Sequence, residues 1–135
     1  MKPPDSGIPL VIDTSAWVRH GRPGSLAYWE VAVERELLVS CPVATLEIFR
    51  LARNQEEFEI LDETLSALPQ AHVTKSVCDA ALSASRELGA RRRIPLPGYL
   101  IAAAAAERGF GVLHADRHFD LLATVLEFES VRLPE

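Results

Sequence analysis

Short apolar segments alternate along this chain with stretches that have the spacing of amphipathic helices, and this alternation constrains the fold more than any other feature. The strand-like segments run over Leu10–Ile12, Leu37–Ser40, Gly111–His114 and Val131–Leu133. Strands that alternate with helices form mostly parallel sheets that are covered on both faces. We therefore expect a three-layer α/β/α domain around a mostly parallel sheet of four or five strands.

Residues that favour the starts and ends of helices punctuate the segments between these strands. Glycine and proline interrupt the chain at 21–24, at Pro69 and at Gly89. We expect Ile94–Pro97 to be extended, because the residue before a proline avoids the helical region. The predicted helices are a short one capped by Thr14 or Ser15, followed by helices from Ser25, from Val43, over Gln55–Leu68, over Ser76–Leu88, over Gly98–Ala106 and over Phe119–Val125, with a short extended segment at Ala71–Thr74.

The length of 135 residues fits one domain with a sizeable core, and we assign that domain to residues 10–135. Residues 1–9 contain three prolines and a glycine. Such a composition predicts a flexible lead-in that contributes little to the core.

The charge balance limits how the chain could hold a polyanion. It has 14 basic and 19 acidic residues, a formal net charge of −5. The chain therefore has no net positive charge that would attract nucleic acid, so a nucleic acid would have to be held by a local basic patch or through a metal ion.

The same sequence favours a cytoplasmic protein. Cys41 and Cys78 both lie in apolar segments, and the N-terminus lacks the pattern of a secretory signal. No apolar run approaches the roughly 20 residues of a membrane-spanning helix. We expect a reduced, cytoplasmic setting without membrane association.

Two carboxylates follow predicted strands. Asp13 comes directly after the first strand, and Asp116 stands two residues beyond Gly111–His114. Right-handed crossovers place the ends of both strands at one edge of the sheet, where open α/β sheets bind their ligands. The two carboxylates should therefore converge. Asp13 followed by Thr14 and Ser15 is also an ordinary helix-capping sequence.

A third carboxylate lies on an apolar helical stripe. Glu47 shares this stripe with Ala44, Ile48 and Leu51. An unpaired buried carboxylate is costly. Glu47 therefore either reaches solvent at the edge of the stripe or is a ligand that points into a cleft.

The only basic run is Arg91-Arg92-Arg93, directly before the apolar block that begins at Ile94. Three arginines in a row most often form a solvated loop. Their position also allows them to contact phosphates.

Four sequence blocks in this chain carry a family resemblance. LVIDTSAW, ATLEIF, IPLPGYLIAAAAAERG and VLHADRHFDLLA occur in this order and cover nearly all of the chain after residue 9. Together they resemble the successive blocks of the PIN-domain ribonucleases, and within that family the VapC-type toxins of bacterial toxin–antitoxin pairs. The resemblance implies a PIN-like fold with an acidic pocket that binds Mg²⁺ or Mn²⁺.

The resemblance also assigns site residues. Asp13 matches the first family acid, Glu47 the second and Asp116 the fourth, and Ser15 and Thr14 match the hydroxyls beside the first acid. The third acid usually follows the proline before the Leu-Ile-Ala-Ala run, and here that position is Gly98.

Glycine offers no side-chain oxygen, so we expect weaker metal binding, with one ion rather than two, and impaired activity. Asp120 or a water molecule could partly compensate. A natural degenerate site and a deliberate inactivating substitution both fit this glycine, and Pro-Gly is also an ordinary way to enter a helix.

The resemblance implies a metal-dependent endoribonuclease toxin that cuts exposed single-stranded RNA, with Arg91, Arg92 and Arg93 steering the RNA backbone. It also implies a homodimer and a small VapB-type antitoxin whose C-terminal segment lies along a groove near the acids. The alternative is a catalytically silent PIN domain that acts as an antitoxin- or RNA-binding module, because position 98 is glycine.

Other assignments of the same residues are weaker. A phosphoryl-accepting Asp13, as in haloacid-dehalogenase enzymes, requires Asp-x-Asp, but Ser15 occupies the second position. His114, Asp116 and His118 could bind zinc only if the strand continued past Asp116; otherwise His118 pairs locally. A triad of Ser15, His118 and Asp116 lacks the Gly-x-Ser-x-Gly elbow that exposes a nucleophilic serine.

Four aromatic residues are candidates for an apolar groove or a dimer face. Aromatic residues at helical spacing belong more often to the core. The four are Trp17, Tyr28, Trp29 and Phe49.

Overall fold

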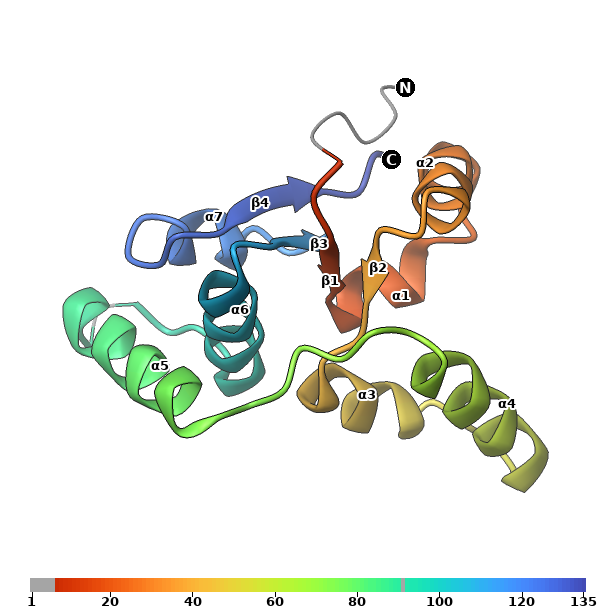
Figure 1. Ribbon diagram of the computed structural model, residues 1–135, viewed down its shortest axis with the longest axis horizontal. Helices are drawn as coiled ribbons and strands as arrows, with labels where there is room; N and C mark the ends of the chain where they lie inside the picture. Colours follow the sequence, from red (N-terminus) through yellow and green to blue (C-terminus); the bar gives the residue numbers. More distant parts are fainter. Residues whose placement is uncertain (1–6, 91) are drawn as a thin grey trace.

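The computed structural model describes residues 7–90 and 92–135. Helices and strands alternate along the chain as expected (Figure 1). Their bounds are β1 Leu10–Ile12, α1 Thr14–Arg19, α2 Pro23–Glu34, β2 Leu38–Val39, α3 Pro42–Phe49, α4 Gln55–Ser66, α5 Lys75–Leu88, α6 Leu96–Arg108, β3 Gly111–His114, α7 His118–Leu122 and β4 Glu129–Arg132.

The described strands form one four-stranded sheet in the order β2-β1-β3-β4, and every neighbouring pair is parallel. Leu10 pairs with Leu38 on one side and with Gly111 on the other, which places β1 inside the sheet. The predicted parallel sheet is thus confirmed, with four strands.

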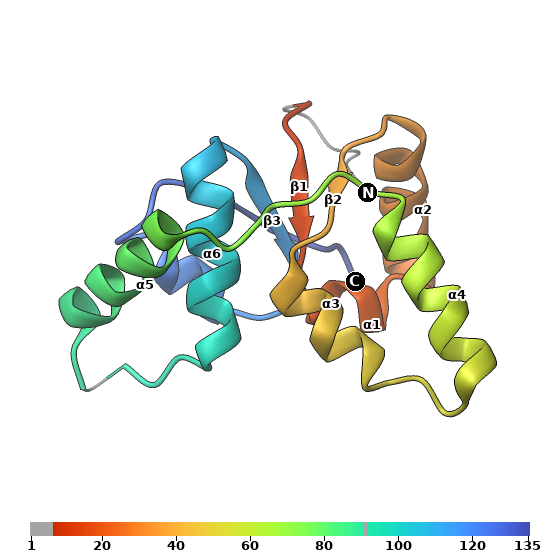
Figure 2. The same cartoon turned by 60° about the horizontal axis from the view of Figure 1, so that its bottom comes forward.

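Helices cover both faces of this sheet (Figures 1 and 2). Val11 and Val112 belong to the core cluster that includes α3, α5 and α6, whereas their neighbours Leu10, Ile12 and Leu113 belong to the cluster under α1 and α2. Successive strand side chains point to opposite faces, so adjacent residues of one strand enter different cores. The three-layer α/β/α architecture is therefore confirmed.

Small side chains bring α6 close to the sheet. The run Ala102–Ala105 is fully or almost fully buried. Gly109 then ends α6 in the left-handed conformation, with φ of 69°, which glycine adopts without steric cost.

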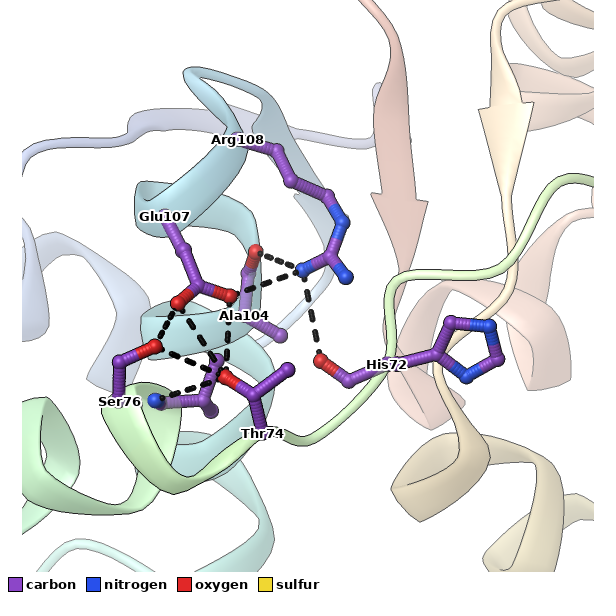
Figure 3. Close-up of polar contacts among 7 residues, drawn as sticks. His72, Thr74, Ser76, Ala104, Glu107 and Arg108 are labelled. Atoms are coloured by element: carbon purple, nitrogen blue, oxygen red, sulfur yellow. Dashed lines mark hydrogen bonds and ion pairs between the residues drawn. The ribbon is translucent and has the colours of Figure 1, made fainter.

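A group of polar contacts connects the C-terminal end of α6 with the N-terminal end of α5 (Figure 3). Glu107 accepts hydrogen bonds from the hydroxyls of Thr74 and Ser76, and Thr74 also caps α5 through the Val77 amide. Arg108 donates to the carbonyls of His72 and Ala104. The two helices are thereby held together at this end as well as by their apolar contact.

Several helix starts differ from the prediction. Asp13, not Thr14 or Ser15, caps α1, because its carboxylate accepts the Ser15 amide. Helix α2 begins at Pro23 instead of Ser25, and α6 begins at Leu96 instead of Gly98. Proline is well tolerated in the first turn, where its missing N–H has no helical partner to lose. The extended assignment of Ile94–Pro97 was therefore wrong at Leu96 and Pro97.

Other boundaries shift by a few residues. The segment Ala71–Thr74, expected to be extended, belongs to neither a helix nor a strand, and Gln70 just before it forms an isolated bridge with Ser40. Helix α7 ends at Leu122 instead of Val125, and β4 covers Glu129–Arg132 instead of Val131–Leu133.

Part of the predicted lead-in, residues 1–6, lies outside the described residues, and Ile8 packs against the core beneath α1 and α2. Among the aromatic candidates, Tyr28 and Trp29 are buried core residues. Trp17 is half-buried against Trp29, and Phe49 packs on Phe58. Within residues 7–90 and 92–135, no helix is long and apolar enough to cross a membrane.

Candidate active site

Asp13, Glu47 and Asp116 line a single cavity of about 250 Å³. Asp13 follows β1, Asp116 follows β3, and Glu47 projects from α3. The parallel pairing of β1 with β3 brings the ends of both strands together, as predicted from the sequence. The remaining lining residues are Thr14, Ser15, Ile94, Pro95, Pro97, Gly98, His118 and Phe119.

Ser15 joins the ends of β1 and β3. Its amide donates to Asp13 Oδ2 at 3.0 Å, and its hydroxyl donates to the same oxygen. The Ala115 amide in turn donates to Ser15 Oγ at 2.9 Å. Ser15 therefore fixes the orientation of the Asp13 carboxylate, which agrees with its predicted place beside the first acid.

Asp13 is buried, with only 7% of its surface exposed. Burial raises its pKa, the two hydrogen bonds from Ser15 oppose this rise, and the nearby carboxylates of Glu47 and Asp116 add to it. A buried carboxylate with a raised pKa in a cavity is typical of functional sites.

Glu47 is half-buried and turned into the cavity. Thr14 Oγ1 donates to its Oε1 at 2.8 Å. Of the two possibilities left open by the sequence, the structure thus favours a carboxylate that faces a cleft. The Thr14 contact gives this hydroxyl a positioning role that the sequence pattern alone did not specify.

Asp116 is held by the backbone and by His118. The His118 amide donates to Asp116 Oδ1 at 2.9 Å. His118 Nδ1 also lies 2.7 Å from Oδ1, although the ring is not aligned for a hydrogen bond. His118 thus pairs locally, as the sequence suggested.

Sequence reasoning missed a hydrogen-bond network behind Asp116, which runs from the buried His114 to the exposed Asp120. His114 Nδ1 accepts the Asp116 amide at 3.1 Å, so the ring proton lies on Nε2, which contacts Ser130 Oγ at 2.7 Å. Ser130 donates to Asp120 Oδ1 at 2.7 Å. Burial lowers the pKa of His114 to about 4. The available signal was a histidine at the end of a buried strand, two residues before an acid.

Gly98 lies in the first turn of α6 and lines the cavity, as its alignment with the third family acid predicts. A Cβ at this position would lie 3.4 Å from Ile94 Cγ2 and 3.6 Å from Leu122 Cδ1, which is ordinary contact. A Cβ therefore fits here. Asp120 does not line this cavity and is bound to Ser130, so the expected compensation by Asp120 finds no support.

The donor set of this cavity suits a hard divalent cation, because carboxylate and hydroxyl oxygens are the ligands that Mg²⁺ and Mn²⁺ prefer. In the part of the chain that the structure describes, no three His, Cys, Asp or Glu side chains converge closely enough to hold an ion as they stand. A zinc site of His114, Asp116 and His118 is also excluded, because both ring nitrogens of His114 form other hydrogen bonds.

Two of the three predicted arginines, Arg92 and Arg93, lie beside the acidic cavity and do not line it. Arg92 and Arg93 line a neighbouring groove together with Arg117. Arg91 lies outside the described residues.

Comparison with known proteins defines the class to which this fold and cavity belong. The family model described as PIN domain matches residues 10–125. The chain therefore belongs to the PIN domain family, as the sequence blocks suggested.

Within this family the chain is of the VapC type. It is 38% identical over 117 residues to Ribonuclease VapC51 of Mycobacterium tuberculosis, covering 85% of each chain. It is 34% identical over 128 residues to Ribonuclease VapC2 of the same species, covering 91% of each.

Solved structures share the fold at low sequence identity. VapBC2 from Rickettsia felis, bound to a DNA fragment from its promoter, matches with a TM-score of 0.74 at 12% identity, covering 95% of this chain and 100% of the other. VapBC-5 from Mycobacterium tuberculosis matches with a TM-score of 0.67 at 19% identity, covering 91% and 97%.

Proposed function

We propose that this chain is a metal-dependent endoribonuclease toxin that cleaves single-stranded RNA. The observation that carries the proposal is the convergence of Asp13, Glu47 and Asp116 from three elements on one cavity. Burial raises the pKa of Asp13, and the nearby carboxylates of Glu47 and Asp116 add to this rise, so a bound cation would stabilise the charged form. The names of the curated relatives, ribonucleases of the VapC type, point to the same reaction.

In this proposal Asp13, Glu47 and Asp116 hold Mg²⁺ or Mn²⁺. The bound ion supplies a Lewis acid that stabilises charge on the phosphate and lowers the pKa of a water molecule. The protein holds its ligands in place: Ser15 orients Asp13, Thr14 orients Glu47, and the His118 amide orients Asp116.

Gly98 weakens this site without abolishing it. Mg²⁺ needs only one or two protein carboxylates when water completes its octahedral shell. The loss of one carboxylate lowers the mutual repulsion and the attraction for the cation together. We therefore expect a lower metal affinity and a lower rate than in a variant with a fourth carboxylate.

A catalytically silent module is the second candidate. It is favoured by Gly98 at the position of the third acid and because, in the described residues, the carboxylates that share the cavity are not close enough together to hold one ion as they stand. In that case the chain binds an antitoxin or RNA without cutting.

Both candidates include a VapB-type antitoxin as partner. The structural neighbours include a toxin–antitoxin complex from Klebsiella pneumoniae. Large apolar side chains are exposed on α1, α3 and α4 and on the segment between α3 and α4. An antitoxin or a second copy of the chain in a homodimer would cover them. They are Val18, Leu46, Leu51 and Ile60.

Calorimetric titration with Mn²⁺ and an assay on single-stranded RNA test the proposal. We expect weak Mn²⁺ binding and slow cleavage by the chain, and a gain in both for Gly98→Asp. Asp13→Asn is the matched control and should lose both. If neither the chain nor Gly98→Asp cleaves RNA, the nuclease proposal is wrong and the silent module stands.

A further inference from the structure

A second groove adjoins the acidic cavity. It measures about 630 Å³ and shares Ile94 and His118 with the cavity, so the two form one continuous surface. The other residues that line the groove are Arg92, Arg93, Arg117, Asp120, Leu121 and Thr124.

The arginines of this groove come from two separate segments. Arg92 and Arg93 precede α6, whereas Arg117 precedes α7, directly after Asp116. All three are exposed, and in residues 7–90 and 92–135 none of them has a carboxylate within ion-pair distance. The one carboxylate of the groove, that of Asp120, accepts the Ser130 hydroxyl. The groove is therefore basic in a chain with a net charge of −5.

The opposite side of the molecule is acidic. Helix α4 carries five carboxylates and no lysine or arginine: Glu56, Glu57, Glu59, Asp62 and Glu63. Arg53, just before this helix, is paired with Glu57 at 2.8 Å. Helix α4 lies far from α6 and α7 in both views (Figures 1 and 2). A polyanion that reaches the acidic cavity is thus attracted on the α7 side and repelled on the α4 side.

We propose that Arg92, Arg93 and Arg117 bind the backbone phosphates next to the scissile one, so that single-stranded RNA runs from the acidic cavity toward α7. This inference rests on the proposed function. Guanidinium groups match phosphate oxygens in a bidentate geometry and remain charged at all relevant pH values. Contacts to the backbone position the strand without reading its sequence. Arg117 is the new member of this set, because it does not belong to the basic run.

Binding of a fluorescein-labelled oligouridylate in EDTA, followed by fluorescence anisotropy at several salt concentrations, tests the groove independently of catalysis. Each phosphate contact in a single-stranded complex contributes about 0.7 to the slope of log K against log salt. We therefore expect Arg117→Ala and Arg93→Ala each to weaken binding and to reduce the slope by about 0.7. Arg50→Ala removes the same charge from an exposed position at the end of α3 and should leave the slope unchanged.

The outcomes separate this inference from the proposed function. If RNA binds but Arg117→Ala behaves like Arg50→Ala, the groove is not the phosphate track, whether or not the chain cleaves RNA. An absence of RNA binding in EDTA also overturns the inference. If Arg117→Ala lowers the slope while Gly98→Asp fails to cleave RNA, the groove stands and the nuclease proposal fails. Circular dichroism confirms that each variant is folded.

Discussion

At the scale of the residue, Asp13 has two opposite effects on the stability of the folded chain. As the cap of α1 it stabilises the fold, and as a buried carboxylate near Glu47 and Asp116 it carries a charge in an unfavourable place. Because its pKa is raised in the folded state, the folded chain binds this proton more tightly than the unfolded chain. Its contribution to stability is therefore greatest in acid and falls as the pH rises through the folded pKa.

This conflict predicts the effect of Asp13→Asn on stability. Asparagine caps helices as well as aspartate does, and it removes the buried charge. We expect the metal-free variant to be more stable by about 1 kcal/mol at neutral pH, as happens when function is traded for stability. Urea unfolding in EDTA measures this difference. The exposed Asp79→Asn serves as control, and a loss of stability in Asp13→Asn would contradict the argument.

His114 predicts a pH dependence of the opposite sign. Its pKa is about 4 in the folded chain, below the ordinary value of 6.5, so the unfolded chain binds this proton first. The stabilisation is complete above the ordinary pKa and is lost as the pH falls toward the folded pKa. Between about pH 7 and about pH 5 this group should remove about 2 kcal/mol from the free energy of unfolding.

Urea unfolding at both pH values measures this change. His114→Gln should flatten the pH profile, whatever its stability at neutral pH. His72→Gln, at an exposed position, should keep the profile of the unchanged chain. Equal profiles for the two variants would show that His114 does not titrate as the structure implies.

At the scale of the element, two glycines predict opposite responses to alanine. Gly98 is in helix α6 with room for a Cβ, so Gly98→Ala should stabilise the chain by about 0.5–1 kcal/mol through helix propensity. Gly111 starts β3, where a Cβ would lie 2.9 Å from Leu10 Cδ2 and 3.0 Å from the Glu129 carbonyl oxygen. Gly111→Ala should therefore destabilise by about 1–3 kcal/mol.

Thermal unfolding of the two variants under one condition compares these effects directly. If Gly98→Ala is less stable than the unchanged chain, position 98 requires glycine for its backbone conformation. Loss of the family acid would then not be the reason for the glycine.

The elements also show what could be predicted from the sequence. The bounds of β1 and β3 follow from short apolar runs that end in polar residues, and the structure agrees with both. The starts of α2 and α6 were misplaced because Pro23 and Pro97 signal a break as readily as a first helical turn.

The site was predictable where topology decides it and not where side-chain conformation does. The meeting of Asp13 with Asp116 follows from parallel strands. Other features of the site depend on side-chain rotamers and on loops between distant segments, and the spacing of residues in the sequence does not encode these. They are the Thr14–Glu47 hydrogen bond, the His114 network and the position of Arg117.

At the scale of the whole molecule, the two cores share one sheet, which predicts a single unfolding transition. Trp17 and Trp29 both lie in the layer of α1 and α2, so tryptophan fluorescence reports on that layer. Circular dichroism reports on all helices. We expect the two signals to coincide in urea, as for most single domains of this size. Separate transitions would mean that the layers unfold independently.

The position of β1 between β2 and β3 has a consequence for synthesis of the chain on the ribosome. Asp13 emerges before β3 and its partner Asp116, which follow only after the helices α1 to α6 have been translated. Contacts between such distant segments form only after both have been translated. A nascent chain therefore carries no complete acidic cavity. If the chain is a ribonuclease, the ribosome that makes it is protected from it until β3 and Asp116 have been translated.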